Sequence, residues 1–509
     1  MDVFQEYKPI RNKISALSIE EALGTIWAYC QYLQIDNFRF PKEIEVSNEY
    51  LKLDVPQQWI SEWELEQLAK EVILNGQLVA KKDRALRTWK TLSEFINSLK
   101  GLENRIYKAF GSPQSVLVEM IRIAHRQFIW QANPPNSAAI IRYFKIFNRP
   151  AIDEICLDKI GLTIWETYMC ATGCMGFFLD RPAIAIPFKV EIKALSIEAF
   201  EKFFAFTSRP LAELKSKLKS EQQYNANFAY AYNSLRAYPL VRMTYQGGET
   251  LVCPMMGLLY WRFTSGLYYE FINVPEFANE FGDGFQAYVG EVVERACPAP
   301  MQWLGEQLYT IGKAQKRTVD WIVADEHSAL FLECKAKRLS WDAKSSLEDL
   351  GPLEGDIDSM AAAVVQVYKT LADHLANAYP HFPAKEGRKI FPAVVTLENW
   401  RMFGPVMMNK LTEAVASKLD GAGLPPHLVE QMPYSIWAIE ELEVGLQIMH
   451  ANGIADFLEG KLKSEEMRQW DWHGYMTNRY PNSFPVKKLF EKDYDDMFSE
   501  LYRAQSASN

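Results

Sequence analysis

Two hydrophobic runs joined by a turn constrain the fold of this chain more than any other feature. The runs span residues 318–325 and 328–338, and both alternate in the manner of β-strands. Alternation puts Asp320 on the face of the apolar residues Ile322 and Ala324, and it puts Glu333 and Lys335 together on one face of the second run. The sequence therefore predicts a β-hairpin that carries two carboxylates and an ammonium group in an apolar setting.

Charged side chains in such a hairpin are costly to bury unless they neutralise one another or a metal ion. The carboxylates of Asp320 and Glu333 offer hard oxygen ligands to Mg²⁺ or Mn²⁺, and such a metal lowers the pKa of a bound water and stabilises charge on a phosphate. Lys335 adds compact positive charge, while Cys334 is expected to point into the core. The pattern indicates metal-assisted phosphodiester hydrolysis. The alternative is an exposed edge hairpin whose charges face water.

The residues around the hairpin predict further elements. Apolar residues recur at helical spacing over 285–296, and residues 301–310 are typical of an edge strand. After a charged loop over 341–358, residues 359–379 predict a helix and residues 389–397 predict a strand. The expected order is therefore one helix, three strands, a second helix and a fourth strand.

This arrangement resembles the PD-(D/E)XK phosphodiesterases, the restriction-endonuclease-like superfamily that includes type II restriction enzymes and Holliday-junction resolvases. The resemblance covers roughly residues 282–397 and implies a mixed α/β fold with an αβββαβ core. It also implies that Asp320 is the motif aspartate, Glu333 the second acidic ligand and Lys335 the motif lysine. Val319 stands where the name of the motif implies a proline.

The resemblance implies accessory residues as well. Many members carry an acidic residue on the first helix that assists the metal, and Glu291 is the candidate here, with Glu294 in reserve. Some members place a glutamine on the helix after the motif, a position that Gln366 matches. A longer Gln-x-x-x-Tyr pattern is not followed, because Thr370 stands at its last position.

Charged residues next to the motif have two interpretations. Lys337 and Arg338 follow the motif closely enough to contact phosphate, but solvated charges at a strand end are an equal alternative. His327 lies in the predicted turn and is expected to face solvent rather than to act as a general base.

The tripeptide Glu-x-Lys also occurs at 191–193, 213–215 and 459–461, so it means little without its context. The last two lie in helical patterns, where positions i and i+2 do not face each other, and they are expected to be solvated surface charges. The first competes with the main motif because Asp180 precedes it across a predicted hairpin around residues 180–182. Pro187, however, interrupts its strand.

Four regions are expected along the chain. They are a mainly helical region over 1–225 for regulation or recognition, with a small β element near 173–195; a connecting β/helical segment over 226–280, with a hairpin turning at Gly247-Gly248; the nuclease core over 281–400; and a helical C-terminal region over 401–509. Capping patterns at Ser18 and Ser61 mark two of the N-terminal helices.

Composition narrows the class of protein. A net charge of −9 counts mildly against a nucleic-acid partner, although a nuclease needs positive potential only along its groove. No apolar stretch approaches the roughly 20 residues that span a bilayer, so no membrane association is expected. The N-terminus is charged from its second residue and the seven cysteines are scattered, which favours the cytoplasm and reduced thiols.

Together these features predict a Mg²⁺- or Mn²⁺-dependent nuclease that acts on DNA, and the resemblance favours bacterial anti-phage defence. The alternatives are a catalytically silent nucleic-acid-binding or scaffold protein with a nuclease-like fold, and a nuclease directed at RNA. No GxGxxG or GxxxxGK[ST] sequence occurs, so an ATPase would be a separate partner. A protein activator and a homo-oligomer are left open as further partners.

Overall fold

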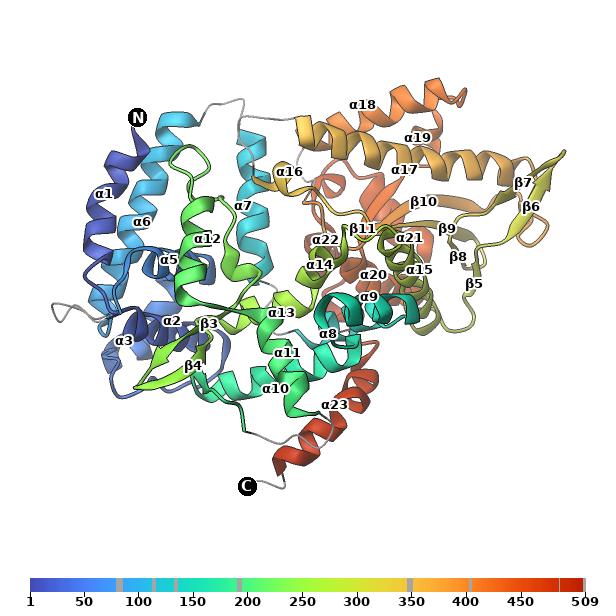
Figure 1. Cartoon of the computed structure of the whole chain (residues 1–509). Coiled ribbons are helices and arrows are strands. Elements are labelled where there is room, and N and C mark those ends of the chain that lie inside the picture. Colours follow the sequence, from blue (N-terminus) through green and yellow to red (C-terminus); the bar gives the residue numbers. More distant parts are fainter. Residues whose placement is uncertain are drawn as a thin grey trace. The chain divides into compact units, whose positions relative to one another are not determined.

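The chain forms two compact units in a computed structural model (Figure 1). Unit 1 comprises Met1–Phe277 and Glu491–Asn509, and unit 2 comprises Ala278–Phe490. The structure describes residues 1–78, 86–111, 116–131, 136–189, 195–345, 351–401, 405–484 and 486–506. Within these residues no helix is both long and apolar enough to cross a membrane.

Unit 1 is mainly helical, as the sequence predicts. Its helices are α1 (Val3–Ile14), α2 (Ile19–Gln34), α3 (Asn48–Lys52), α4 (Val55–Trp59), α5 (Glu62–Asn75), α6 (Trp89–Phe110), α7 (Val116–Gln131), α8 (Ser137–Phe147), α9 (Pro150–Ile160), α10 (Ile164–Asp180), α11 (Ile197–Thr207), α12 (Leu211–Glu221), α13 (Met256–Phe263), α14 (Tyr268–Phe271) and α23 (Glu491–Ser506), with the 3-10 turns η2 (Ser234–Arg236) and η3 (Ser265–Leu267). Ser18 caps α2 by accepting from the Glu21 amide, and Ser61 and Glu64 form a capping box at the start of α5. Both predicted helix starts are confirmed.

A small sheet completes unit 1. Its strands are β1 (Ala183–Ala185), β2 (Ser208–Pro210), β3 (Leu240–Tyr245) and β4 (Gly248–Val252), in the order β1-β4-β3-β2. The predicted hairpin is present, and its two turn residues are Gln246 and Gly247, whose φ values of 50° and 81° suit a tight turn between antiparallel strands. The predicted connecting segment over 226–280 therefore contributes β3 and β4 to the sheet of unit 1.

The predicted strand before residue 180 is wrong. Helix α10 runs through this region to Asp180, and β1 is the one strand that follows it among the described residues up to 189. The helix starts with a capping box at Thr163 and is apolar on most sides, so its sequence lacks the one-sided period that distinguishes a helix from a strand. The competing tripeptide Glu191-Ile192-Lys193 lies outside the described residues.

Unit 2 holds the main sheet and its covering helices. The helices are α15 (Phe277–Ala296), which begins at the unit boundary, α16 (Trp341–Ser345), α17 (Gly351–Leu375), α18 (Pro405–Gly421), α19 (Leu428–Gln431), α20 (Ile439–Asn452), α21 (Ile454–Leu462) and α22 (Trp472–Arg479), with the 3-10 turns η4 (Met467–Gln469) and η5 (Pro481–Ser483). The strands are β5 (Gln302–Gly305), β6 (Leu308–Ile311), β7 (Ala314–Arg317), β8 (Trp321–Ala324), β9 (Ser328–Lys335), β10 (Lys389–Thr396) and β11 (Ser435–Ala438).

Five of these strands form one mixed sheet in the order β11-β10-β9-β8-β5. β5, β8 and β9 are antiparallel neighbours, whereas β10 and β11 run parallel to β9. The mixed α/β class is confirmed. Two additions were not predicted: the separate hairpin β6–β7 between β5 and β8, and the edge strand β11 in the region expected to be wholly helical.

Other parts of unit 2 also differ from expectation. The predicted loop over 341–358 contains α16 and the start of α17. The helical pattern that holds residues 459–461 belongs to the second of two helices, α20 and α21, which are separated at Gly453, whose φ of 90° ends α20. Lys461 is buried and donates to the Met467 and Trp470 carbonyl oxygens, so the expectation of a solvated surface charge is wrong there. In α12, by contrast, Glu213 is exposed.

Helices α15 and α17 cover opposite faces of the sheet. The Trp321 ring packs on Gly290 of α15, and its Nε1 donates to the Gln286 carbonyl oxygen at 3.0 Å. On the other face, the Phe331 ring lies 5.1 Å from the His374 ring of α17. The two helices therefore fix the hairpin β8–β9 from both sides.

Gly290 permits the close approach of α15 to β8. A Cβ at this position would lie 2.2 Å from Cζ2 of Trp321, so Gly290→Ala must displace the indole ring. We expect it to lower the free energy of unfolding by roughly 1–3 kcal/mol, measured by chemical denaturation.

The matched control is Gly282→Ala in the same helix, where a Cβ meets no atom within 4 Å. Removing a helical glycine there is expected to be neutral or to stabilise by up to about 1 kcal/mol. Equal unfolding free energies for the two variants would contradict the packing described for Trp321.

Candidate active site

The hairpin β8–β9 brings Asp320 and Glu333 to adjacent positions. Trp321 pairs with Leu332 in antiparallel register, so the next residues outward, Asp320 and Glu333, lie opposite each other. Directly opposed residues of an antiparallel pair project from the same face of the sheet. Asp320 immediately precedes β8 rather than lying within it. The two predicted carboxylates are thus cross-strand neighbours.

Glu333, Lys335 and Gln366 form a closed set of hydrogen bonds. Lys335 Nζ lies 2.8 Å from Glu333 Oε1 and 3.1 Å from Gln366 Oε1. Gln366 Nε2 donates to Glu333 Oε1 at 2.6 Å. The amide of Gln366 thus uses its oxygen on the lysine and its nitrogen on the glutamate, which fixes both charged groups on the face covered by α17.

Asp320 is held by the backbone of the opposite strand. Its Oδ2 accepts a hydrogen bond from the Cys334 amide at 2.6 Å. Burial, followed by the charges of Asp320 and Glu333, raises the pKa of the Cys334 thiol well above its ordinary value. The thiol therefore stays protonated and is a poor nucleophile.

Burial and like charge govern the electrostatics of the carboxylates. Burial, and next the charge of Glu333, raise the pKa of Asp320 to about 7, although the Cys334 amide and Lys335 act in the opposite direction. Burial also raises the pKa of Glu333, opposed by Lys335. One ammonium group does not fully compensate buried Glu333 and partly buried Asp320, so the pair favours a proton or a further cation.

Glu306 is an acidic neighbour that sequence reasoning missed. Gly305 pairs with Trp321, so the next residue, Glu306, follows opposite Asp320 on the other side of β8. Its charge contributes to raising the pKa of both Asp320 and Glu333, and its own carboxylate lies 2.9 Å from Arg317. Its position depends on the register between β5 and β8, which the sequence does not reveal.

The two predicted acidic residues of α15 lie on the helix that covers the other face of the sheet. Glu291 is 3.8 Å from Arg295, one helical turn away, and its side chain is 38% exposed. Glu294 is exposed. Assistance to a metal by Glu291 or Glu294 stays a prediction.

The charged residues beside the motif differ in accessibility. Lys337 is 3.1 Å from Asp356 and remains about half exposed. Arg338 is buried, and its guanidinium lies 3.2 Å from Glu398, so it serves an internal ion pair. His327 is exposed in the turn, as expected. Of the two predicted phosphate contacts, Lys337 is therefore the one accessible to a ligand.

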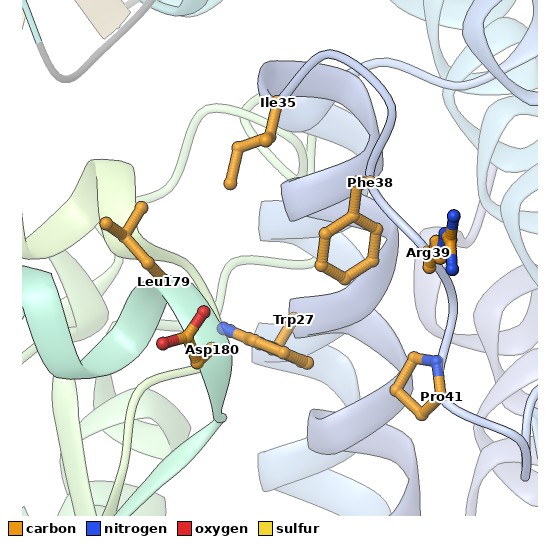
Figure 2. A pocket seen from close by; sticks show the side chains of 7 residues that line it. All are labelled: Trp27, Ile35, Phe38, Arg39, Pro41, Leu179 and Asp180. Carbon is orange, nitrogen blue, oxygen red and sulfur yellow. The ribbon is translucent and has the colours of Figure 1, made fainter. Parts of the chain in front are cut away.

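A pocket of about 720 Å³ opens in unit 1, and none of the predicted site residues lines it. Figure 2 shows Trp27 and Phe38 at its centre, with Leu179 and Asp180 on one side. The lining residues are Trp27, Ile35, Phe38, Arg39, Pro41, Leu179 and Asp180. This mostly apolar lining lacks the paired carboxylates and the lysine of the unit 2 site.

The donor set of the unit 2 site decides which metal it can accept. Among the described residues, no group of three or more His, Cys, Asp or Glu side chains is arranged to hold a metal ion. Asp320 and Glu333 instead supply two carboxylates. Mg²⁺ commonly takes only one or two carboxylates and keeps several waters, whereas a structural zinc site requires four protein ligands. The residues therefore fit Mg²⁺ or Mn²⁺ and do not fit structural zinc.

Comparison of the chain with protein-family models, with curated proteins and with solved structures finds no match. The chemistry of Asp320, Glu333, Lys335 and Gln366 is therefore the basis for a function.

The raised pKa of Asp320 predicts a pH-dependent stability in metal-free protein. Its pKa is about 7 in the folded chain and about 3.9 in an unfolded one, so the folded state binds more protons between these values. Stability should therefore fall as pH rises from about 4 to 7. Asp320→Asn removes this loss, and in EDTA we expect it to raise the free energy of unfolding at pH 8 by on the order of 2 kcal/mol.

The measurement is chemical or thermal unfolding of both proteins between pH 4 and 8.5. The gain from Asp320→Asn should shrink as pH falls toward 4. Asp420→Asn, at an exposed position of unit 2, serves as control and should show no such trend. A difference between Asp320→Asn and the parent that does not vary with pH would show that Asp320 is ionised throughout.

Proposed function

We propose that this protein is a metal-dependent nuclease whose active site contains Asp320, Glu333 and Lys335. The observation that carries the proposal is the cross-strand pair of buried Glu333 and partly buried Asp320, both with raised pKa values, next to a lysine held by Glu333 and Gln366. Perturbed carboxylates beside a fixed cation are typical of catalytic sites. The substrate proposed for this site is DNA.

Asp320 and Glu333 would hold Mg²⁺ or Mn²⁺. A bound metal of this kind supplies an activated water and stabilises negative charge on a phosphate. Binding the cation would relieve the repulsion between the two carboxylates, because a divalent charge replaces the proton that the pair otherwise favours. Both side chains would then stay ionised at neutral pH.

Lys335 would act on the phosphate itself. Its ammonium group is fixed by two hydrogen bonds and is one-third exposed, so it is both oriented and accessible. A compact positive charge at this point offsets negative charge that develops on the phosphate oxygens during cleavage. Gln366 is a positioning residue in this scheme, since it acts through Glu333 and Lys335.

The order of elements adds support. Helix α15, strands β5, β8 and β9, helix α17 and strand β10 follow one another as in the αβββαβ core that the resemblance to PD-(D/E)XK enzymes implies. By the same resemblance, the biological setting would be bacterial anti-phage defence. Unit 1, which is separate and mainly helical, would then regulate the nuclease or recognise its target.

Metal-dependent cleavage tests the proposal directly. The full-length protein is incubated with plasmid, linear duplex DNA, single-stranded DNA and RNA, each with Mg²⁺, Mn²⁺ or EDTA. We expect cleavage of DNA only with metal, and a loss of about 10²-fold or more in rate for Asp320→Asn and Lys335→Ala.

Glu326→Gln is the matched control, because this carboxylate lies in the turn at the other end of the same hairpin and is 81% exposed. It should cleave at the parental rate. Metal-dependent cleavage that survives in both Asp320→Asn and Lys335→Ala would refute the site. Absence of cleavage under every condition, with metal bound by the parent, would favour the scaffold alternative.

The role of Gln366 gives a separate prediction. Gln366→Ala removes one hydrogen bond to Glu333 and one to Lys335, and residues that orient metal ligands typically contribute 10- to 100-fold in metal affinity or activity. We expect the Mg²⁺ concentration for half-maximal cleavage to rise about 10-fold, with KM for DNA little changed.

The control for this experiment is Ser359→Ala. Ser359 lies in the same helix, two turns before Gln366, and its hydroxyl donates to the Gly355 carbonyl oxygen. It should leave the Mg²⁺ titration unchanged. If Gln366→Ala changed KM for DNA but not the Mg²⁺ titration, the glutamine would contact substrate rather than position the site.

A further inference from the structure

The hairpin β6–β7 is an insertion between two strands of the main sheet. It leaves the sheet after Glu306 and returns at Thr318, two residues before Asp320. Four residues of each strand pair, and the turn begins at Gly312, whose φ of 60° suits a two-residue hairpin loop. Figure 1 shows the two strands projecting away from β8 and β9.

One face of the hairpin anchors it to α17. Tyr309 and Lys316 are paired across the strands, and both reach Asp373 Oδ2 at 2.7 Å. The Tyr309 ring also lies 4.7 Å from the Tyr379 ring. At the base, Gln307 and Thr318 exchange hydrogen bonds of 2.9 Å. The projection is therefore held firmly at its root.

The opposite face of the hairpin is exposed. Leu308 pairs with Arg317, and Thr310 pairs with Gln315, so these four side chains share that face. Arg317 is 69% exposed even though it contacts Glu306, and Lys313 at the tip is exposed as well. Thr310 and Gln315 offer hydrogen-bonding groups on this face, Leu308 and Arg317 lie on it at the base, and Lys313 lies in the turn at the tip.

The charge of the hairpin is opposite to that of the chain. Residues 308–317 contain three basic residues and no acidic one, whereas the whole protein carries −9. Lys316 is paired with Asp373, so the cations that a ligand can reach are Lys313 and Arg317, which is 69% exposed although it contacts Glu306. Accessible positive charge on a projection is a pattern by which an acidic protein can hold a polyanion locally.

We infer that the hairpin β6–β7 binds double-stranded DNA by inserting its exposed face into the major groove. This inference deepens the proposed function and rests on it. A strand of four residues is about 13 Å long, and the major groove of B-DNA, about 12 Å wide, admits a two-stranded β-ribbon. Lys313 and Arg317 contact phosphates, while Gln315 and Thr310 face the base edges.

The same geometry selects DNA over duplex RNA. The major groove of A-form RNA is deep and narrow, so side chains on a ribbon do not reach its base edges. The base of the hairpin lies two residues before Asp320 in the chain, at the end of the sheet that carries the carboxylates. The hairpin thus supplies affinity for DNA, whose phosphates the two carboxylates alone would repel.

Salt dependence of binding tests the inference. Fluorescence anisotropy with a labelled DNA duplex, in Ca²⁺ or EDTA to prevent cleavage, gives the slope of log K against log salt concentration. Each phosphate contact contributes about 0.9 to this slope. For Lys313→Ala/Arg317→Ala we expect the slope to fall by about 2 and affinity at low salt to fall about 10-fold or more.

The matched control is Lys418→Ala/Lys463→Ala, which removes two positive charges from ion-paired positions of unit 2, one in α18 and one directly after α21. It should change the slope by much less than 1. Gln315→Ala should leave the slope unchanged and weaken discrimination between duplex sequences. Equal melting temperatures of all variants check that the exposed substitutions leave the fold intact.

The outcomes separate this inference from the proposed nuclease. DNA binding that depends on the hairpin, without cleavage under any metal, keeps the inference and refutes the nuclease. Cleavage by a protein whose salt slope is the same with and without Lys313 and Arg317 refutes the inference alone. Tighter, hairpin-dependent binding of duplex RNA than of DNA overturns the inference, and no binding of any nucleic acid overturns both.

Discussion

The repulsion between Asp320 and Glu333 is the constraint on which the site in unit 2 depends. The two carboxylates oppose each other across paired strands, and the sheet cannot separate them because α15 and α17 pack against it from both sides. Glu66 of unit 1 is a carboxylate in the opposite situation. In unit 1, burial acts to raise the pKa of Glu66, but Arg236 donates two hydrogen bonds to it and the pKa falls below its ordinary value. Glu66 is satisfied internally, whereas the unit 2 pair is not.

Sequence patterns predicted the parts of this site that depend on local geometry. Alternation along 328–335 places Glu333 and Lys335 on one face, and no tertiary information is needed for that. Gln366, on the following helix, forms hydrogen bonds with Glu333 and Lys335. Only the family resemblance singled out this glutamine, because no local pattern distinguishes it from other polar residues of the helix; its role stays a prediction.

Features that depend on long-range pairing were not predictable in this way. Glu306 becomes a neighbour of the carboxylates only through the register of β5 on β8, and β11 joins the sheet about 40 residues after its partner β10. Helix α10 was mistaken for a strand because it is apolar on most sides, so its sequence has no helical period to detect. These differences share one cause: contacts with the rest of the fold, rather than the local sequence pattern, determine the secondary structure and the strand pairing of these segments.

Helix α17 carries Gln366 and Asp373 seven residues apart, on nearly the same side of the helix. Gln366 fixes Lys335, and Asp373 fixes the base of the β6–β7 hairpin. With a rise of 1.5 Å per residue, the helix sets the spacing of these two attachment points at about 10 Å. Because both attachment points lie on one rigid helix, the distance between Lys335 and the base of the β6–β7 hairpin is fixed by that helix. Any ligand that shifts α17 along its axis moves both together.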